Sequence, residues 1–368
     1  MKLLVCAFEY PPHGSGIANA AQSVVEELQK LGVDVTVCSP TGPDIVIGNP
    51  RLIRDLPLVG LLQYWGGVER IDGTDAYDAV WCHNPLFPLG SPLPRTIGTI
   101  HSTYRDKLAS GMAPNLYYRL AAAIERRSLL RTARRGRLTT ASQNVLDDLT
   151  SIGIDPGTVA LIPNGVDTGR FAPGGDRDAL RREFGIPDDE IVLLSLGRLS
   201  EAKRPERLVE VFAGVAGRVP RSTLVIAGTG ERLGETRSRA VSLGVADRVR
   251  FLGRVSAEQV PRLYRLADCY VMASRSEGSP LSLLEALSSG LPAVVSDISP
   301  LRFVGDSGCG LVVDFDDPER AADRISAYLS GDLRVAGELA RAYVEGRLDW
   351  AVISRRYLDL FEQVAEER

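Results

Sequence analysis

The chain alternates short apolar runs with amphipathic helical segments along nearly all of its 368 residues. The runs of the first half are KLLVCAF, VDVTVCS, DAVWCHN, TIGTIHS, RLTTAS and VALIPNG, and those of the second half are IVLLSLG, STLVIAG, RVRFLG, CYVMAS, PAVVSD and GLVVD. This alternation is typical of parallel sheets whose faces are covered by helices. The sequence therefore predicts an α/β fold whose strands are mostly parallel.

A cluster of Pro, Gly and Asp residues, PNGVDTGRFAPGGDRD, separates the two halves. The runs are too many for one open sheet, so we place a hinge in this cluster, near Gly165. The prediction is two doubly wound, Rossmann-like domains, residues 1–167 and 168–349, that face a central cleft at the carboxyl ends of their strands. Residues 350–366 have apolar positions at helical spacing and are predicted to form a last helix.

Composition and charge exclude several classes of protein. A hydrophobic fraction of 44% supports packed cores, and a net charge of -4 gives no general attraction to nucleic acid. The five cysteines are scattered and lie mostly in apolar runs, so we expect buried thiols in a reducing compartment. The first residues indicate a strand rather than a secretory signal, and no stretch approaches the roughly 20 apolar residues of a membrane span. We therefore expect a cytoplasmic protein with no nucleic-acid partner.

The stretch SEGSPLSLLEALSSGLP places two carboxylates beside a site for an anion. Ser279 suits the N-cap and Pro280 the first position of a helix that ends before Gly290. The free amides at the start of this helix attract a phosphate, whereas Glu277 and Glu285 would repel it. A ligand with sugar hydroxyls on both sides of a diphosphate resolves the conflict, because ionised carboxylates accept hydrogen bonds from diols. By spacing alone, solvated loop and helix charges are the simpler interpretation.

A basic segment, GRLSEAKRP, follows the predicted strand that ends at Gly197. Arg198 and Lys203 lie at the carboxyl end of that strand, where ligands bind in this architecture. They could neutralise a leaving diphosphate without a metal. The alternative is a solvated loop with its usual charges.

The segments GRLSEAKRP, IPNGVD and EGSPLSLLEA together resemble those of the retaining family-four glycosyltransferases, which have the GT-B fold. The resemblance covers essentially the full chain. It implies that the first domain binds the acceptor and is completed by the last helix, and that the second domain binds a nucleotide-sugar. The donor contacts that the resemblance implies are Arg198, Lys203, Glu277, Glu285, the backbone of Gly278, Ser279, Pro280, Leu281 and Ser282, and the loop LGRVS near Val255.

In the first domain, candidate residues follow three predicted strands. Gly14 and Gly16 would let the backbone approach a phosphate, although a flexible turn without a ligand is the alternative. The family often has paired glycines here, and Gly-Ser-Gly departs slightly from that pattern. His101 ends a strand and matches the family's histidine near the transferred sugar. His83 and Asn84 also end a strand and are candidates for the acceptor side.

The resemblance implies transfer of a sugar from a UDP- or GDP-linked donor to an acceptor hydroxyl, with retention of the anomeric configuration. Such a reaction serves glycolipid, cell-envelope polysaccharide or glycan synthesis. Arg198, Lys203 and the helix amides would stabilise the departing diphosphate, while Glu277 and His101 would hold the sugar. We expect no cofactor and no metal, since Asp317 in DFDDP is better explained as a helix cap than as a metal ligand.

Other classes stay open at this point. A phosphorylase or a sugar-nucleotide epimerase on the same fold needs a similar phosphate cleft. A catalytically silent partner subunit could bind a nucleotide-sugar without transfer, although the paired glutamates and both cations argue against it. A dinucleotide-dependent oxidoreductase is disfavoured, because the second strand ends in VTVCSP without an acidic residue and AGTGERLG lacks the third glycine.

Two segments of the first domain could contact a membrane surface. The apolar stretch NPRLIRDLPLVGLLQYWGGVERI carries Arg51 and Arg54 ahead of Leu61, Leu62 and Trp65, and RRSLLRTARRGR is a basic helix. The ordinary interpretation is a packed loop and a solvated helix. The hypothesis is peripheral association at the inner face of the membrane with a lipid-linked acceptor, and a glycan or a small molecule is the alternative.

Overall fold

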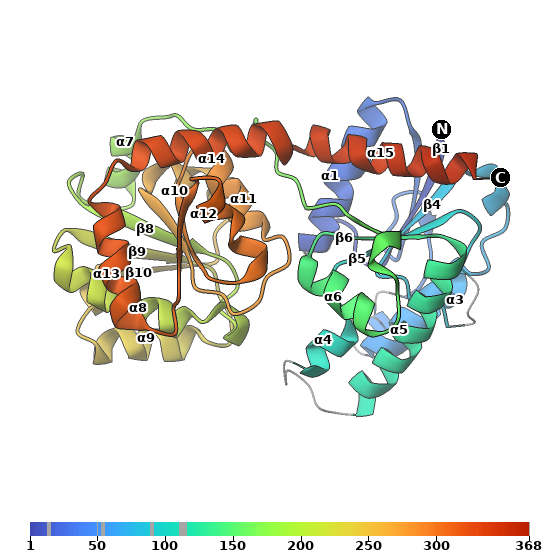
Figure 1. The fold of residues 1–368 in the computed structure, drawn as a ribbon, viewed down its shortest axis with the longest axis horizontal. Helices are drawn as coiled ribbons and strands as arrows, with labels where there is room; N and C mark the ends of the chain where they lie inside the picture. Colours follow the sequence, from blue (N-terminus) through green and yellow to red (C-terminus); the bar gives the residue numbers. More distant parts are fainter. Residues whose placement is uncertain (13–15, 50, 53–55, 89–91, 110–115, 368) are drawn as a thin grey trace. The chain divides into compact units, whose positions relative to one another are not determined.

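The computed structural model describes residues 1–12, 16–49, 51–52, 56–88, 92–109 and 116–367 of the chain. It divides into two compact units, Met1–Asn164 with Trp350–Arg368, and Gly165–Asp349 (Figure 1). The first segment thus ends just before the predicted boundary at residue 167, and the C-terminal helix belongs to the first unit. Each unit is described by itself below.

The first unit is built on a parallel sheet with the strand order β3-β2-β1-β4-β5-β6-β7. Its strands are β1 Lys2–Ala7, β2 Asp34–Ser39, β3 Ile45–Val46, β4 Ala79–His83, β5 Thr96–Ile100, β6 Arg137–Thr140 and β7 Val159–Leu161. All residues of β4 and β5 are buried, which explains why continuous apolar runs rather than alternating ones form these strands. The sequence did not predict β3, because two residues are too few to give a pattern.

Helices cover this sheet (Figure 1). They are α1 Gly16–Lys30, α3 Pro57–Val68, α4 Tyr104–Ala109, α5 Leu116–Arg135, α6 Gln143–Ser151 and α15 Trp350–Glu366. The predicted last helix is α15, which packs along α1 and onto β4. Its Tyr357 and Phe361 rings lie 4.9 and 5.6 Å from the Trp81 ring, so the end of the chain contributes to the core of the first unit.

The α3 segment is part of the core rather than a membrane contact. Trp65 is 0% exposed and Leu61 is 8% exposed. Leu62 packs against the same apolar cluster, which includes residues of the sheet and of α5. The prediction that these three side chains enter a membrane is therefore wrong, because a helix that is apolar on most sides is buried between two layers. Arg54 lies outside the described residues.

The second unit has a parallel sheet with the order β10-β9-β8-β11-β12-β13. Its strands are β8 Ile191–Leu196, β9 Ser222–Ala227, β10 Val249–Gly253, β11 Cys269–Met272, β12 Ala293–Ser296 and β13 Gly310–Val313. Its helices are α7 Arg177–Glu183, α8 Pro205–Arg218, α9 Leu233–Ser242, α10 Val260–Leu266, α11 Leu281–Ser288, α12 Phe303–Asp306, α13 Pro318–Leu329 and α14 Leu333–Arg347. Both units thus have the doubly wound, Rossmann-like architecture that the sequence predicts.

The strand order reverses at one place in each sheet, between β1 and β4 in the first and between β8 and β11 in the second. Ligands of doubly wound sheets bind at this reversal, beyond the carboxyl ends of the strands. The topology brings most candidate residues to these two places: Gly16, His83 and Asn84 in the first unit, and Arg198, Lys203 and Glu277 in the second.

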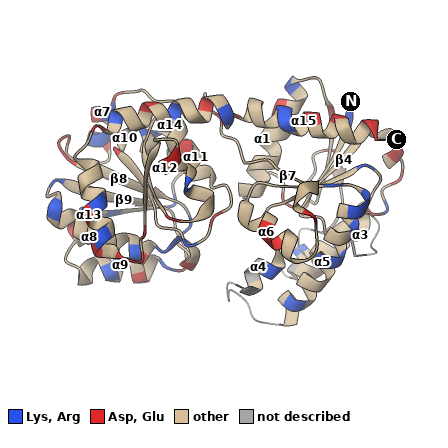
Figure 2. Cartoon of the chain, in the orientation of Figure 1, with Lys and Arg blue, Asp and Glu red and all other residues tan. Residues whose placement is uncertain are grey.

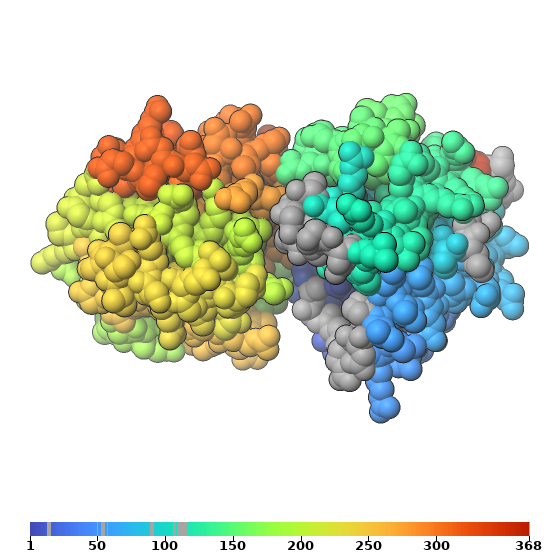
Figure 3. Space-filling model, turned by 90° about the horizontal axis from the view of Figure 1, so that it is seen from below, coloured from blue at the N-terminus to red at the C-terminus, as the bar shows by residue number. Residues whose placement is uncertain are grey.

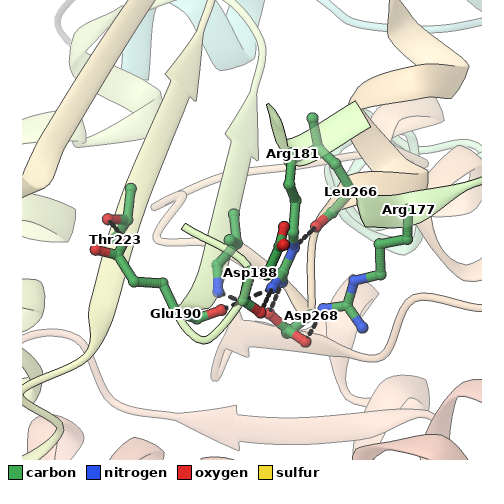
Figure 4. A network of polar contacts seen from close by, with 8 residues as sticks. Arg177, Arg181, Asp188, Glu190, Thr223, Leu266 and Asp268 are labelled. Atoms are coloured by element: carbon green, nitrogen blue, oxygen red, sulfur yellow. Dashed lines mark hydrogen bonds and ion pairs between the residues drawn. The ribbon is translucent and has the colours of Figure 1, made fainter. Parts of the chain in front are cut away.

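A buried charge network holds the amino ends of β8 and β11 together (Figure 4). Arg181 of α7 is 3% exposed, and its guanidinium lies 2.6 Å from Asp268 Oδ2. The same arginine donates to the carbonyls of Leu266, Asp188 and Glu190 at 3.1, 2.8 and 3.0 Å. Asp268 also accepts the Val192 amide at 2.7 Å. These groups are at the end of the sheet opposite to the strand ends that carry the candidate site.

All five cysteines are buried and free, which confirms the prediction of buried thiols. Cys6 on β1 is in register with Cys38 on β2 and with Cys82 on β4. Over the ranges that the structure describes, none of the helices has the length and apolar character needed to cross a bilayer.

Candidate functional site

An ion pair forms at the carboxyl end of the second sheet. Lys203 ends a short 3-10 helix after β8, and Glu277 lies in the loop between β11 and α11. Lys203 Nζ donates a hydrogen bond to Glu277 Oε1. The Glu277 side chain is 8% exposed and that of Lys203 is 33% exposed. The cation therefore balances the carboxylate in a site that is largely shielded from water.

The helix α11 begins beside this ion pair, one residue later than predicted. Pro280 is its N-cap, with an extended ψ of 112°, and Leu281 is the first helical residue. The prediction that Ser279 caps the helix is therefore wrong, because the proline keeps an extended backbone and shifts the start by one position. The amide of Leu283 donates to Pro280 O at 3.1 Å. The amides of Leu281 and Ser282 have no carbonyl one turn earlier within the helix, so they can bind an anion.

A hollow lies between the ends of β8 and β11, where Arg198, Lys203 and Ser274 contribute to its lining. The Tyr270 hydroxyl lies 3.1 Å from Leu196 O and 2.9 Å from the Ser282 hydroxyl, and thereby ties the start of α11 to β8. Ser274 is 1% exposed, and its hydroxyl has no hydrogen-bond partner among the described residues. A buried unpaired hydroxyl is costly in a native structure, so this one is a candidate ligand contact.

Glu285 points from α11 toward α10, and it is not a solvated surface charge. Its Oε2 lies 2.9 Å from the Tyr264 hydroxyl, which is also 2.9 Å from the Ser282 carbonyl. Burial raises the pKa of Glu285 to about 7, while the Tyr264 hydrogen bond and the charge of Arg170 act in the opposite direction. This carboxyl can therefore change its charge near neutral pH. Its predicted contact with a ribose stays a prediction.

Arg198 is the most exposed of the candidate cations. Its side chain is 74% exposed and lies 3.1 Å from Glu231 Oε2.

Close backbone contact explains the glycines near Arg198: a Cβ on Gly228 would lie 1.9 Å from Gly197 O, and one on Gly230 would lie 2.2 Å from Leu199 O. The glycines of AGTGERLG therefore let two loops cross, and they do not form a dinucleotide-binding turn.

The DFDDP segment serves the second unit's own structure. Asp317 is the N-cap of α13 and accepts the Arg320 amide at 3.1 Å, which confirms the predicted capping role. Asp316 lies 2.8 Å from the guanidinium of Arg204, which also donates to Ala273 O at 2.7 Å. Within the described ranges, no three His, Cys, Asp or Glu residues are grouped so that they could hold a metal ion.

In the first unit, two histidines at neighbouring strand ends are bonded to each other. His83 Nδ1 lies 3.0 Å from His101 Nε2, and the two rings are nearly parallel, at 9°. Burial lowers the pKa of His101 to about 4, and burial together with His101 lowers that of His83 well below its usual range. Both rings are therefore neutral at pH 7. The side chain of Asn84 accepts the His101 amide at 2.8 Å, and Asn84 has a φ of 48°, a strained conformation that asparagine tolerates.

The chain matches two glycosyltransferase families in succession. Residues 14–170 match Glycosyltransferase Family 4, and residues 176–346 match Glycosyl transferases group 1. The chain belongs to the family-four-like glycosyltransferases. It is 35% identical over 226 residues to a D-inositol 3-phosphate glycosyltransferase of Geodermatophilus obscurus. The matched region covers 58% of this chain and 49% of that protein. The chain thus matches about half the length of the first curated relatives. It is 29% identical over 325 residues, 82% of each protein, to an uncharacterized glycosyltransferase of Methanocaldococcus jannaschii.

Solved structures of glycosyltransferases share the fold of this family-four-like chain. WaaG, a glycosyltransferase involved in lipopolysaccharide biosynthesis, superposes with a TM-score of 0.77 at 19% identity over 98% of this chain and 99% of that one. Sucrose-phosphate synthase from Thermosynechococcus elongatus superposes with a TM-score of 0.78 at 20% identity over 99% and 98%. Anabaena HepE in complex with UDP gives 0.77 at 17% identity over 99% and 100%. The fold is therefore GT-B.

The structure says less about the other predicted site residues. Gly14 lies outside the described residues, while Gly16 begins α1 and is exposed. Val255 is half-buried in the loop after β10. Sequence reasoning missed Tyr264 and Tyr270, which hold Glu285 and the start of α11. A tyrosine in an apolar run gives the same pattern as a core aromatic residue, so no local signal distinguishes these two.

Proposed function

We propose that the protein is a retaining glycosyltransferase that moves a sugar from a UDP- or GDP-linked donor to an acceptor hydroxyl without a metal. The single observation that carries this proposal is the Lys203–Glu277 ion pair. It lies beside the first amides of α11, at the place where the strand order of the second sheet reverses, in a chain of this family. The Anabaena HepE structures that share the fold are complexes with UDP and with UDP-glucose, which supports a uridine nucleotide first.

In this proposal, the second unit binds the donor. The amides of Leu281 and Ser282 and the cations of Lys203 and Arg198 receive the diphosphate, whose negative charge grows as the glycosidic bond breaks. Glu277 accepts hydrogen bonds from the transferred sugar, and Glu285 from the ribose. The fixed cations supply the charge stabilisation that a divalent metal would give, so no metal is required.

The first unit binds the acceptor in this proposal. His101 contacts the transferred sugar, and because the ring is neutral at pH 7 it acts through hydrogen bonds rather than as a charged acid. The leaving phosphate oxygen accepts the proton of the attacking hydroxyl on the same face of the sugar, which retains the anomeric configuration. Neither unit then has to provide a nucleophilic side chain.

The experiment is a donor screen that follows nucleotide release and determines the anomeric configuration of the product by NMR. Chelation with EDTA is expected to leave most of the activity, because the DFDDP carboxylates are engaged by Arg204 and by the start of α13. Complete loss that manganese restores would contradict the metal-independent reaction. Phosphate-dependent breakdown of a glycoside would identify a phosphorylase. Interconversion of donors without nucleotide release would identify an epimerase, and donor binding without turnover would identify a silent subunit.

We also propose that the reaction takes place in the cytoplasm, at the inner face of the membrane, in the synthesis of an envelope polysaccharide or glycolipid. The observation that favours membrane contact is α5, which lies on the surface of the first unit (Figure 3) and carries arginines along its length (Figure 2). Leu116 and Leu120, one turn apart at its start, are 82% and 53% exposed, and Arg119 beside them is exposed. Apolar side chains next to cations are typical of helices that bind anionic lipid surfaces.

Co-sedimentation with vesicles that contain phosphatidylglycerol tests the membrane contact at low salt, where screening is weakest. The wild-type protein is expected to bind, and a Leu116→Ser, Leu120→Ser double variant is expected to lose most of the binding. Leu339→Ser, which changes an exposed leucine of the second unit, is the control. Absence of wild-type binding would indicate an acceptor free in solution.

A further inference from the structure

A cavity of about 120 Å³ lies in the first unit beyond the ends of β1, β4 and β5. Phe8, Leu61 and Leu86, which belong to one apolar cluster, form an apolar wall of this cavity, and the rest of its lining includes polar groups. Apolar surface with a few convergent polar groups is typical of sites for small ligands. The space is small, and it suits a single ring with hydroxyl groups better than an extended chain.

The charges of this cavity are negative. Glu9 and Glu125 are the charged residues among the described residues that line it, and no Lys or Arg is among them. Glu125 is 8% exposed, and its Oε2 accepts the Tyr104 amide at 2.8 Å, so the carboxylate is fixed in place. Arg105 of α4 lies 3.2 Å from Asp148 Oδ1 and lines a different hollow.

A histidine in this cavity can recognise hydroxyls. His83 is 3% exposed and lines the cavity, and its Nε2 has no hydrogen-bond partner among the described residues. Because the ring is neutral, this nitrogen can accept or donate a hydrogen bond, depending on the tautomer. Tyr104 also lines the cavity. Burial is the largest cause that raises the pKa of its hydroxyl, and Tyr117 and Glu125 raise it further, so these surroundings disfavour an anion in addition to the Glu125 carboxylate.

We propose that this cavity, given the transferase function above, receives an acceptor polyol that carries no phosphate, and that Glu9 and Glu125 exclude phosphorylated acceptors. Hydroxyl groups donate to carboxylates, whereas a phosphate is repelled by the buried carboxylate of Glu125 and, more weakly, by that of Glu9, which is exposed to solvent. The apolar wall fits the C–H face of a ring. The acceptor class therefore differs from the one named in the D-inositol 3-phosphate glycosyltransferases that the chain resembles.

The test compares matched acceptors with and without phosphate: inositol and inositol 3-phosphate, glucose and glucose 6-phosphate, and N-acetylglucosamine and its 6-phosphate. The full-length protein is supplied with the donor from the screen, and kcat/KM is measured for each acceptor. The unphosphorylated member of a pair is expected to be preferred at least tenfold. Glu9→Gln and Glu125→Gln are each expected to reduce that preference at least threefold, because the amide keeps the size and an acceptor atom but removes the charge.

Glu362→Gln, which neutralises an exposed carboxylate of α15 in the same unit, is the control and should leave the preference unchanged. Four outcomes would each overturn the proposal. The wild-type protein could prefer phosphorylated acceptors or turn over no acceptor in any pair. The control could lose the preference as much as the cavity variants do, or both cavity variants could keep the wild-type preference. Donor hydrolysis without acceptor and calorimetric binding of the nucleotide are measured in parallel. If both persist while the acceptor preference fails, the transferase function stands and only the acceptor class is wrong.

Discussion

Lys203 donates a hydrogen bond to Glu277 across the loop that leads into α11. The pair explains how a carboxylate can lie beside a helix start that attracts anions. The ammonium offsets the charge of the carboxylate, so a diphosphate that reaches the amides of Leu281 and Ser282 meets a nearly neutral site rather than a negative one. A buried pair of this kind loses much of its value when one partner is removed, because the other charge is then left alone.

Replacing Glu277 by Gln is expected to lower kcat by about two orders of magnitude or more, since an amide is a weaker acceptor for sugar hydroxyls whose hydrogen bonds strengthen in the transition state. Steady-state kinetics with the identified donor measure this effect. Glu338→Gln, at an exposed position of α14, is the matched control and should retain wild-type turnover. Unchanged turnover in a folded Glu277→Gln protein would remove Glu277 from the proposed mechanism.

Lys203→Ala is expected to weaken transition-state binding by about 2 to 4 kcal/mol if the ammonium stabilises the diphosphate. The double variant with Glu277→Gln should lose less than the sum of the two single variants, because the two groups contact each other and each single change already breaks the pair. A double-mutant cycle on kcat/KM measures the difference. Additive losses would mean that the two side chains act independently.

The Glu285 carboxyl should make stability depend on pH. Burial raises its pKa in the folded protein to about 7 from an ordinary value of 4.5. The unfolded chain therefore releases this proton first as pH rises, and folding loses stability between about pH 4.5 and 7, by about 3 kcal/mol in total. Glu285→Gln cannot ionise, so its free energy of unfolding relative to wild type should rise by that amount over this range.

Urea unfolding of wild type and Glu285→Gln at half-unit pH steps measures this change. The exposed Glu338→Gln variant should follow the wild-type curve. A constant difference between wild type and Glu285→Gln from pH 4.5 to 7.5 would show that the carboxyl ionises normally in the folded protein.

The charge network at the amino ends of β8 and β11 should affect stability but not donor binding. Arg181→Met leaves the half-buried Asp268 charge without its main partner and is expected to cost about 3 kcal/mol of unfolding free energy. Arg177→Met removes the other arginine that contacts Asp268, but this side chain is 43% exposed, so the expected cost is below about 1 kcal/mol. Nucleotide affinity, measured by calorimetry on the folded proteins, should be equal in both variants, and a selective loss in Arg181→Met would contradict the separation.

The sequence predicts the fold well because the central strands of both sheets are buried on both faces, so that they appear as continuous apolar runs. It also places Arg198, Lys203 and Glu277 correctly at strand ends, since the parallel topology collects those ends. It does not predict which side chains pair there. Lys203 and Glu277 are 74 residues apart and Arg204 and Asp316 are 112 apart, and their contacts depend on how the loops pack. It leaves the place of α3 open for a related reason: an apolar segment flanked by arginines has the same pattern in a core as at a membrane.

The histidine pair of the first unit leads to the last prediction. Burial lowers the pKa of His101 to about 4, and that of His83 is also well below its usual range, so neither ring should titrate between pH 5.5 and 8. Of the three histidines in the chain, two should therefore show imidazole NMR signals that do not move over this range. Neither histidine should therefore contribute a limb near pH 6.5 to the pH dependence of kcat.

His83→Ala should reverse this behaviour. The substitution replaces a buried ring with space that water can enter beside His101, which reduces the desolvation that keeps His101 neutral. The pKa of His101 should then rise toward 6.5, its NMR signal should titrate, and a new loss of kcat should develop below about pH 6.5 as the ring becomes charged and loses the acceptor nitrogen of its neutral form. Circular dichroism at each pH separates this effect from unfolding. If all three wild-type histidines titrate near pH 6.5, the buried neutral pair does not exist in solution.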